Sequence, residues 1–285
     1  MLIIDMQQEG DPWLLFNKLH DLRSRSKTQM FPEADFMTVS TAGKDEDGRI
    51  VPNSRLVELL EASEDQGFVF TSSIESEKGK ELQENPSASL LFFYCFENNN
   101  NGGGEFLKIV SASKSKNYEP IPAPMLLTVQ IRVKGTVLIS SDEKELRRRF
   151  DELPRACQVG LLATNARQSM PIQDEDEYEA RCGSLVREFL LPSESDRAID
   201  SPPTSMSTSF GNVEERRNLL RAERSLENVP AVPLPSSWKA FHVHPIEFIF
   251  YFGGDPRYFN DIYRFSSHIQ QDGGRRGWKI EKIVP

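Results

Sequence analysis

The stretch FVFTSSIESEKGKELQENPSASLLFFYCF, residues 68–96, decides the fold. It opens with the short apolar run Phe68–Thr71 and closes with a longer one, Ala88–Phe96, and both are typical of buried strands. Between them, Ser76–Asn85 has the composition of a helix. Ser76 is a suitable N-cap, and Asn85 is followed by a proline that ends the helix. We therefore expect a strand, a helix and a second strand in this order.

The residues before this stretch predict a helix and two strands. Asp11–Leu22 has apolar residues at helical spacing, with Asp11 as N-cap and a proline in the first turn. Residues 36–41 and 50–60 read as strands. They are joined by a turn in which Gly48 takes a positive φ. A second turn, Asp65–Gly67, leads into Phe68.

The residues after it add a long strand, a helix and three more strands. Met125–Ile139 alternates like a strand, with Gly135 as a bend or bulge, and Ser141–Phe150 reads as a capped helix. The last strands are expected over residues 241–252, 261–265 and 278–283. About seven short strands with few helices predict a mainly β fold, a closed antiparallel barrel with peripheral helices. We expect one domain over residues 1–285, with disordered insertions at 97–124 and 192–213.

The composition of the chain limits which partners it is expected to bind and in which cellular compartment it is expected to lie. The chain has 285 residues with 34 Lys and Arg against 43 Asp and Glu, a net charge of −9 and a pI of about 5.2. This balance argues against broad binding of nucleic acid or of anionic membranes. No apolar run reaches the roughly 20 residues of a membrane helix, and residues 1–10 do not resemble a signal peptide. The three cysteines form no CxxC pair, which argues against a disulfide framework and against a zinc site. Their small number favours a cytoplasmic location.

The first candidate site combines Arg55 with the start of the helix at Ser76–Lys78. A helix N-terminus offers free N–H groups and a partial positive charge, so it suits a phosphate. Arg55 and Lys78 would add formal charge, and the hydroxyls of Thr71, Ser72 and Ser76 would add donors. The alternative is an ordinary capped helix with a solvated lysine and a surface arginine. If the two cationic side chains lie far apart, or if an acidic group is buried between them, this interpretation of the site fails.

Two further polar features could contribute to a site. Gln130 lies inside an apolar strand, and an inward-facing glutamine needs partners for its amide, which the pyrimidine edge of a flavin would supply. Pro154–Gly160 and Arg167–Ser169 place polar side chains among apolar ones just after a helix. For each of them the alternative is a satisfied polar residue at a barrel rim.

Taken together, the chain resembles the pyridoxamine 5'-phosphate oxidase family, FMN-dependent split-barrel enzymes of vitamin B6 metabolism. The resemblance rests on an ordered set of segments outside the two insertions: residues 11–16, 48–55, 67–70, 76–82, 85–93, 130–135, 154–160, 168–169, 232–238 and 278–285. It implies an FMN-binding split β-barrel with peripheral helices. It further implies a homodimer with FMN at the subunit interface.

The resemblance also implies site residues. The positions matching flavin contacts are Arg55, Leu56, Thr71, Ser72, Ser76, Lys78, Gln130, Gln168, Ser169 and Tyr251. The positions assigned to the substrate are Arg149, Cys157 and Arg257, which fall at family contacts, and Arg155, which with Arg149 would substitute for missing ones. Several positions depart from the family: Glu77 replaces an arginine near the phosphate, Asp261 falls where the last arginine is expected, and Phe259 replaces a histidine on the substrate side.

The implied reaction oxidises pyridoxamine or pyridoxine 5'-phosphate to pyridoxal 5'-phosphate, with oxygen as acceptor and hydrogen peroxide as by-product. The flavin does the redox chemistry, so no catalytic side chain is expected. Two alternatives stay open: a flavin-binding split-barrel protein with a different substrate, and a non-catalytic paralogue. The rewritten substrate positions favour the former, and the acidic residues Glu77 and Asp261 favour the latter.

Overall fold

The computed structural model describes residues 2–5, 10–25, 35–98, 107–110, 125–164, 172, 174–190, 230–253, 261–269 and 276–284. The chain divides into two compact units. Unit 1 comprises Met1–Thr71, Glu81–Ile139 and Phe241–Pro285, and unit 2 comprises Ser72–Lys80 and Ser140–Ala240. The two units differ in secondary structure: the first is mostly sheet and the second is mostly helix.

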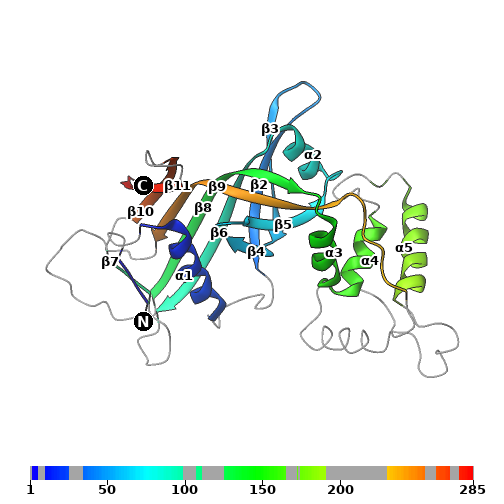
Figure 1. Ribbon diagram of the computed structural model, residues 1–285, viewed down its shortest axis with the longest axis horizontal. Helices are drawn as coiled ribbons and strands as arrows, with labels where there is room; N and C mark the ends of the chain where they lie inside the picture. Colours follow the sequence, from blue (N-terminus) through cyan, green and yellow to red (C-terminus); the bar gives the residue numbers. More distant parts are fainter. Residues whose placement is uncertain are drawn as a thin grey trace. The chain divides into compact units, whose positions relative to one another are not determined.

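Unit 1 is built on one large sheet (Figure 1). Its strands follow the spatial order β11 (Arg276–Ile283), β10 (Asp261–Ile269), β9 (Trp238–Gly253), β8 (Met125–Ser140), β6 (Ser87–Asn98), β2 (Phe36–Lys44) and β3 (Ile50–Glu58). The strands β4 (Glu61–Ser63) and β5 (Gly67–Ser73) form a hairpin whose second strand pairs with β9. Every predicted strand is present, and β1 (Leu2–Asp5), β4 and β7 (Leu107–Val110) are additions.

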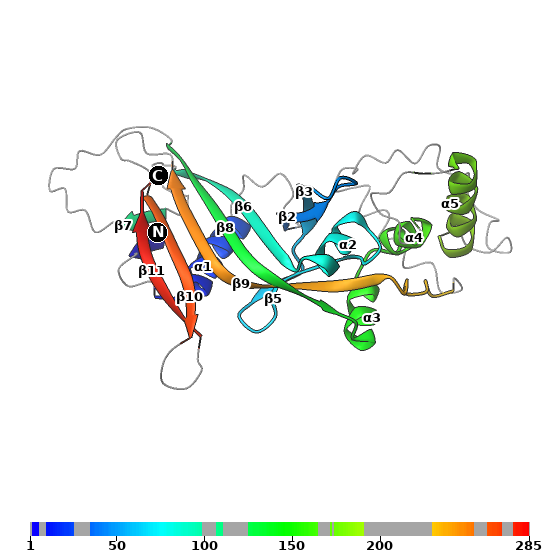
Figure 2. The ribbon, with the colours of Figure 1, turned by 90° about the horizontal axis from the view of Figure 1, so that it is seen from above.

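The helix α1 (Pro12–Arg25) lies against this sheet (Figure 2). Aromatic side chains of the core fix it there. Trp13 stacks on Phe68 of β5 with ring centroids 4.8 Å apart, and Phe16 meets the same ring edge-on at 4.9 Å. The helix begins where the sequence predicts, because an Asp11 side-chain oxygen accepts the Trp13 amide at 2.9 Å. Offset and edge-on contacts of this kind stabilise a core beyond the area that they bury.

Glycines close the predicted turns. Gly48 and Gly67 have φ of +77° and +72°, in the left-handed region that glycine adopts without steric cost. Gly67 also lies so close to β9 that a Cβ there would sit 2.4 Å from the Val243 carbonyl oxygen. Gly135, predicted as a bend, lies within β8, where a Cβ would come 2.6 Å from the carbonyl oxygen of His244. Its smallness therefore permits the close approach of two strands.

Unit 2 contains the helices α3 (Glu143–Asp151), α4 (Arg155–Ala163) and α5 (Glu175–Phe189). The first was predicted, but its N-cap is Asp142, whose side chain accepts the amides of Lys144 and Glu145. The expectation of few helices left out α4 and α5. In α5 an acidic first turn follows the N-cap Asp174, and this start signal precedes a segment with few apolar residues.

The predicted insertions are partly described. Within 97–124, β6 continues to Asn98, and β7 (Leu107–Val110) pairs in parallel with β1 (Leu2–Asp5). The rest of that range, and all of 192–213, lies outside the described residues. We keep a single-domain organisation over residues 1–285 as a proposal. In the part of the chain that the structure describes, no helix is long and apolar enough to cross a membrane.

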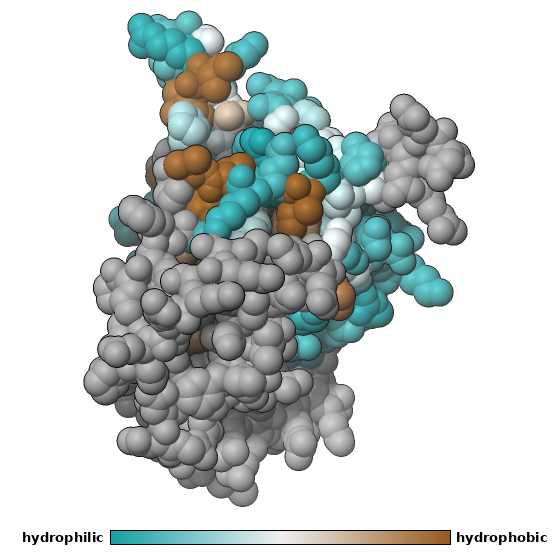
Figure 3. Space-filling model, turned by 90° about the vertical axis from the view of Figure 1, so that its left-hand side faces the viewer, coloured by the Kyte–Doolittle hydropathy of each residue, from teal (hydrophilic) through white to brown (hydrophobic). Residues whose placement is uncertain are grey.

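On the face drawn in Figure 3, hydrophobic residues form separate groups among hydrophilic ones.

Candidate functional site

The helix α2 (Glu77–Glu84) begins at a serine cap, as the sequence predicts. The Ser76 hydroxyl accepts the amide of Gly79 at 3.2 Å and donates to the carbonyl oxygen of Ser73 at 2.7 Å. A Cβ on Gly79 would lie 2.5 Å from the carbonyl oxygens of Ser73 and Ile74, so the first turn is folded tightly over the preceding loop. Cap and glycine together fix where the first turn of the helix begins.

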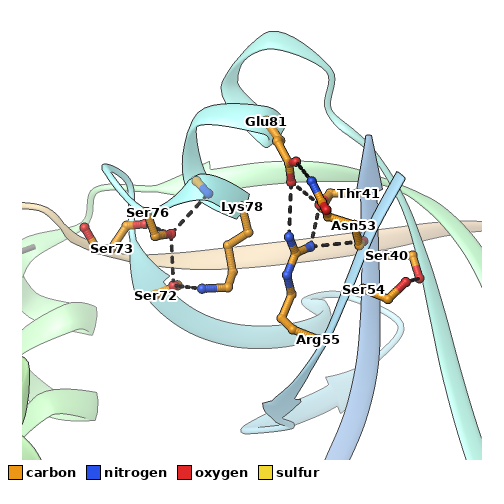
Figure 4. A network of polar contacts seen from close by, with 11 residues as sticks. Ser40, Thr41, Asn53, Ser54, Arg55, Ser72, Ser73, Ser76, Lys78 and Glu81 are labelled. Atoms are coloured by element: carbon orange, nitrogen blue, oxygen red, sulfur yellow. Dashed lines mark hydrogen bonds and ion pairs between the residues drawn. The ribbon is translucent and has the colours of Figure 1, made fainter. Parts of the chain in front are cut away.

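A buried lysine lies beside this cap, in unit 2. The Lys78 side-chain nitrogen donates to the hydroxyl of Ser72 at 3.1 Å, and that hydroxyl lies 3.5 Å from the hydroxyl of Ser76 (Figure 4). Lys78 is 8% exposed and both serines are buried. We call these three residues the Lys78 cluster. An ammonium, the Ser72 hydroxyl and a helix N-terminus make a donor set suited to an anion, and to a phosphate monoester in particular.

Arg55 lies in unit 1 and has a different environment. Its guanidinium donates to the Thr41 hydroxyl at 2.5 Å and forms an ion pair with Glu81 at 3.3 Å. The Glu81 carboxylate also accepts from the Thr41 hydroxyl and, at 2.5 Å, from the Asn53 amide (Figure 4). We call Thr41, Asn53, Arg55 and Glu81 the Arg55 network. It joins β2 and β3 to the last turns of α2.

The fold makes room for this carboxylate. Glu81 is 7% exposed, and a Cβ on Gly43 of β2 would lie 2.9 Å from its Cγ atom. Three side-chain donors therefore converge on a buried acid that packs against a glycine. Arg55 thus has a buried anion, the Glu81 carboxylate, supplied by the chain itself. A buried acid next to a predicted phosphate-binding cation argues against phosphate binding by that cation.

The remaining predicted flavin contacts in the described chain are scattered along the strands. Leu56 follows Arg55 in β3, and it is 70% exposed because successive strand residues face opposite sides. Thr71 in β5, Gln130 in β8 and Tyr251 in β9 are half-buried. Gln130 is paired across the ladder with Phe93, and Tyr251 with Ile262. Their assignment to a flavin stays a prediction.

The predicted substrate residues lie on the helices of unit 2. Arg149 is buried in α3 and pairs with Glu145 at 3.0 Å. Arg155 in α4 donates to the carbonyl oxygen of Phe189 at 2.8 Å and to that of Pro230. Cys157 is exposed. The predicted residues Gln168, Ser169 and Arg257 lie outside the described residues.

Thr41, Asn53 and Glu81 were missed as site residues. Lys78, Glu81 and Leu82 are all buried on α2, at the spacing of one helix face, so helical periodicity could have placed Glu81 beside the predicted lysine. Alternation along the β2–β3 hairpin places Asn53 and Arg55 on one side. The sequence could not show that Glu81 contacts this side of the hairpin.

A separate polar group in unit 1 surrounds His20 of α1. One ring nitrogen of His20 lies 3.0 Å from an Asp35 carboxylate oxygen, and the other lies 3.1 Å from the Tyr94 hydroxyl. Arg23 pairs with the same Asp35. Burial lowers the pKa of His20, and the charge of Arg23 lowers it further. Burial also raises the pKa of Tyr94 well above its ordinary value. A neutral His20 that donates to Asp35 and accepts from Tyr94 fits this arrangement.

Comparison with known proteins decides the family. The family model described as pyridoxamine 5'-phosphate oxidase matches residues 26–181, more than half of the chain. The chain belongs to the pyridoxamine 5'-phosphate oxidase family. The matched range contains both the Lys78 cluster and the Arg55 network, so the two groups lie in the part of the chain that defines its membership.

Curated members of the family match over nearly the whole chain at modest identity. The chloroplastic pyridoxine/pyridoxamine 5'-phosphate oxidase 1 of Arabidopsis thaliana is 26% identical over 99% of this chain and 38% of its own length. The corresponding oxidase of Christiangramia forsetii is 25% identical over 99% of this chain and 92% of its own. The chain thus spans well under half of the plant protein but most of the bacterial one.

Solved structures show the same fold. PhzG of Burkholderia lata, solved with tetrahydrophenazine-1-carboxylic acid, has a TM-score of 0.51 at 17% identity, covering 96% of this chain and 89% of its own. A pyridoxamine 5'-phosphate oxidase-related, FMN-binding protein of Nostoc punctiforme has a TM-score of 0.50 at 13% identity, covering 96% and 98%. The predicted class, a mainly β split barrel with peripheral helices, is confirmed.

Proposed function

We propose that this chain binds FMN and oxidises pyridoxamine or pyridoxine 5'-phosphate to pyridoxal 5'-phosphate, with oxygen as the final acceptor. Family membership supports the class of reaction. The observation that carries the cofactor assignment is the Lys78 cluster. A buried ammonium and the buried Ser72 hydroxyl, at a helix start that the Ser76 side chain caps, are the chemistry that a phosphate monoester needs.

The residues present fit the phosphate of FMN at this cluster. Ser76 fixes the first turn of α2, and Ser72 positions the Lys78 ammonium. Both act before any ligand arrives, so little ordering of side chains is required on binding. Arg55, with its buried acid, we assign as a weaker flavin contact, along with the half-buried Thr71, Gln130 and Tyr251.

The protein's own part in the reaction is placement and charge. When bound, FMN would supply the redox chemistry: it would take a hydride from the substrate carbon, while the substrate also gives up a proton, and it would pass two electrons to oxygen, which takes up two protons and leaves as hydrogen peroxide. With pyridoxamine 5'-phosphate, water would supply the aldehyde oxygen and ammonia would leave. The Lys78 cluster anchors the cofactor's phosphate tail, and no described side chain has to act as a strong base. Activity then depends on how well the substrate is held.

The arginines assigned to the substrate favour a second candidate function. Arg149 is buried against Glu145, and Arg155 is bonded to two backbone carbonyls. A substrate phosphate would have to compete with these partners, and breaking a buried pair is costly. A flavin-dependent oxidoreductase acting on a different substrate is therefore the alternative.

We also propose that the chain forms a homodimer. One face of the sheet carries exposed apolar side chains where β3, β2 and β6 lie side by side. Leu56 pairs with Thr38, which pairs with Leu91, and these side chains share that face. Its large apolar members are Phe36, Leu56, Leu91 and Phe93, which are 38% to 70% exposed. Apolar patches of this kind mark interaction surfaces. Light scattering of the purified chain should give twice 32.4 kDa, and a monomeric mass would refute this proposal.

The reaction is tested by anaerobic reduction. The full chain is loaded with FMN and mixed with pyridoxine 5'-phosphate or pyridoxamine 5'-phosphate without oxygen, and the flavin absorbance is followed. Bleaching by either vitamer, reversed with peroxide release when oxygen is admitted, supports the oxidase. Bleaching by neither vitamer overturns the substrate assignment, and bleaching by another reductant then selects the alternative.

A further inference from the structure

Glu81 stands out among the described acids because its surroundings are built for a carboxylate. It is buried, it accepts from Thr41, Asn53 and Arg55, and it occupies the space that Gly43 leaves open. Removing any one partner of such a group leaves a buried charge poorly compensated. The Arg55 network is thus complete as an ion pair without a ligand.

We propose that Glu81 is a specificity-determining residue that supplies Arg55 with a built-in counter-anion and so weakens the attraction of Arg55 for the phosphate of a flavin nucleotide. This inference rests on the proposed function. A phosphate that contacts Arg55 must share the guanidinium with the Glu81 carboxylate, 3.3 Å away. Phosphate and carboxylate carry like charges, and in contact with the same guanidinium they would repel in partly buried protein, where screening by water is weak.

The inference separates flavins that carry a phosphate from those that do not. FMN has a dianionic phosphate, and riboflavin has the same ring and ribityl chain without it. An effect of Glu81 exerted through charge therefore changes the affinity for FMN alone. A merely structural role in holding α2 on the β2–β3 hairpin would change the affinities for both flavins together.

The test uses the full-length Glu81→Gln variant. Glutamine keeps the shape of the side chain and one acceptor oxygen, and rotation of the Asn53 amide can offer its own oxygen to the new NH₂ group. The matched control is Glu84→Gln, which removes the same charge from an exposed position on the same helix. Thermal melts of each variant confirm folding. FMN and riboflavin affinities are measured by quenching of flavin fluorescence at fixed ionic strength.

We expect Glu81→Gln to bind FMN about tenfold more tightly than the wild type, with riboflavin affinity unchanged and Glu84→Gln within about twofold of wild type for both ligands. Unchanged or weaker FMN binding by a folded Glu81→Gln overturns the inference and leaves the proposed function standing. An equal gain for FMN and riboflavin overturns it as well. If the wild type binds neither flavin, the proposed function fails and this inference fails with it. Should Glu81→Gln not fold, Glu81→Asp, which keeps the charge, must show no gain in FMN affinity, and a gain there overturns the inference.

Discussion

The Lys78 cluster and the Arg55 network each contain a cation, but the partners of the two cations differ in charge. In the Lys78 cluster the ammonium donates to the hydroxyl of Ser72, a neutral group, at the positive end of a helix. In the Arg55 network the guanidinium faces a buried carboxylate from the same helix. A cation at an expected position is therefore not by itself a binding site, because the anion it serves can be part of the chain.

The largest effect expected from this contrast is on cofactor affinity. Lys78→Met keeps the length and burial of the side chain but removes its charge. Loss of a charge-assisted contact with phosphate should weaken FMN binding by about 30- to 100-fold and leave riboflavin binding unchanged. Lys80→Met, on the exposed side of the same helix, is the control. Equal losses for the two variants would mean that the long-range charge of the helix, and not the cluster, attracts FMN.

The Arg55 network should show itself mainly in stability. Thr41→Val removes the hydroxyl that both donates to Glu81 and accepts from Arg55. Leaving a buried charged pair short of a partner should lower the free energy of unfolding by about 1–3 kcal/mol. Ser40→Ala breaks an exposed bond to Ser54 and should cost under about 0.5 kcal/mol. Urea melts that show equal costs would remove the distinction between a buried network and a surface contact.

The caps of two helices separate binding from stability. Ser76→Ala and Asp142→Ala each delete an N-cap, of α2 and α3 respectively, and each should lower the unfolding free energy by about 1 kcal/mol. Only the first should also weaken FMN binding, because only it belongs to the Lys78 cluster. FMN titration of both variants checks this, and a comparable loss in Asp142→Ala would move the phosphate away from α2.

The smallest effect expected is a dependence of stability on pH from His20. Its pKa is lowered in the folded state by burial and by Arg23, against the opposing charge of Asp21, while Asp35 and Tyr94 flank the ring. The folded state therefore binds a proton less readily than the unfolded state. Stability from the neutral ring is full above the ordinary value of 6.5 and is lost as pH falls from there toward the lowered pKa.

Urea melts at pH 7.5 and 5.5 measure this. The loss of unfolding free energy on acidification should be larger for the wild type than for His20→Gln, which has no ring to titrate. Parallel losses in the two proteins would show that His20 contributes nothing to the pH dependence, and would leave the carboxylates as its source.

Local signals predicted much of the fold. Asp11 and Ser76 cap their helices, and Gly48 and Gly67 close their turns, because cap and turn chemistry depends on near neighbours in the sequence. β7 was missed because its pairing with β1 joins segments about a hundred residues apart, and alternation of side chains gives no sign of such a partner.

The candidate site was predicted less evenly. The Lys78 cluster is contained in residues 72–78, so the sequence could bring its members together. The Arg55 network joins Thr41, Asn53 and Glu81 from three elements. Tertiary packing decides which side chains of these elements meet. The sequence therefore indicated Arg55 as a cation but did not indicate Glu81 as the acid that pairs with it. Likewise, the carbonyl partners of Arg155 come from distant residues 189 and 230.

The most direct test of the central claim compares FMN with riboflavin on the unmodified full-length chain. If the phosphate is held by the Lys78 ammonium, the neighbouring hydroxyls and the start of α2, FMN should bind at least about 100-fold more tightly than riboflavin at low ionic strength, and the difference should narrow as salt is added. Equal affinities for the two flavins, or no binding of FMN, would contradict the account.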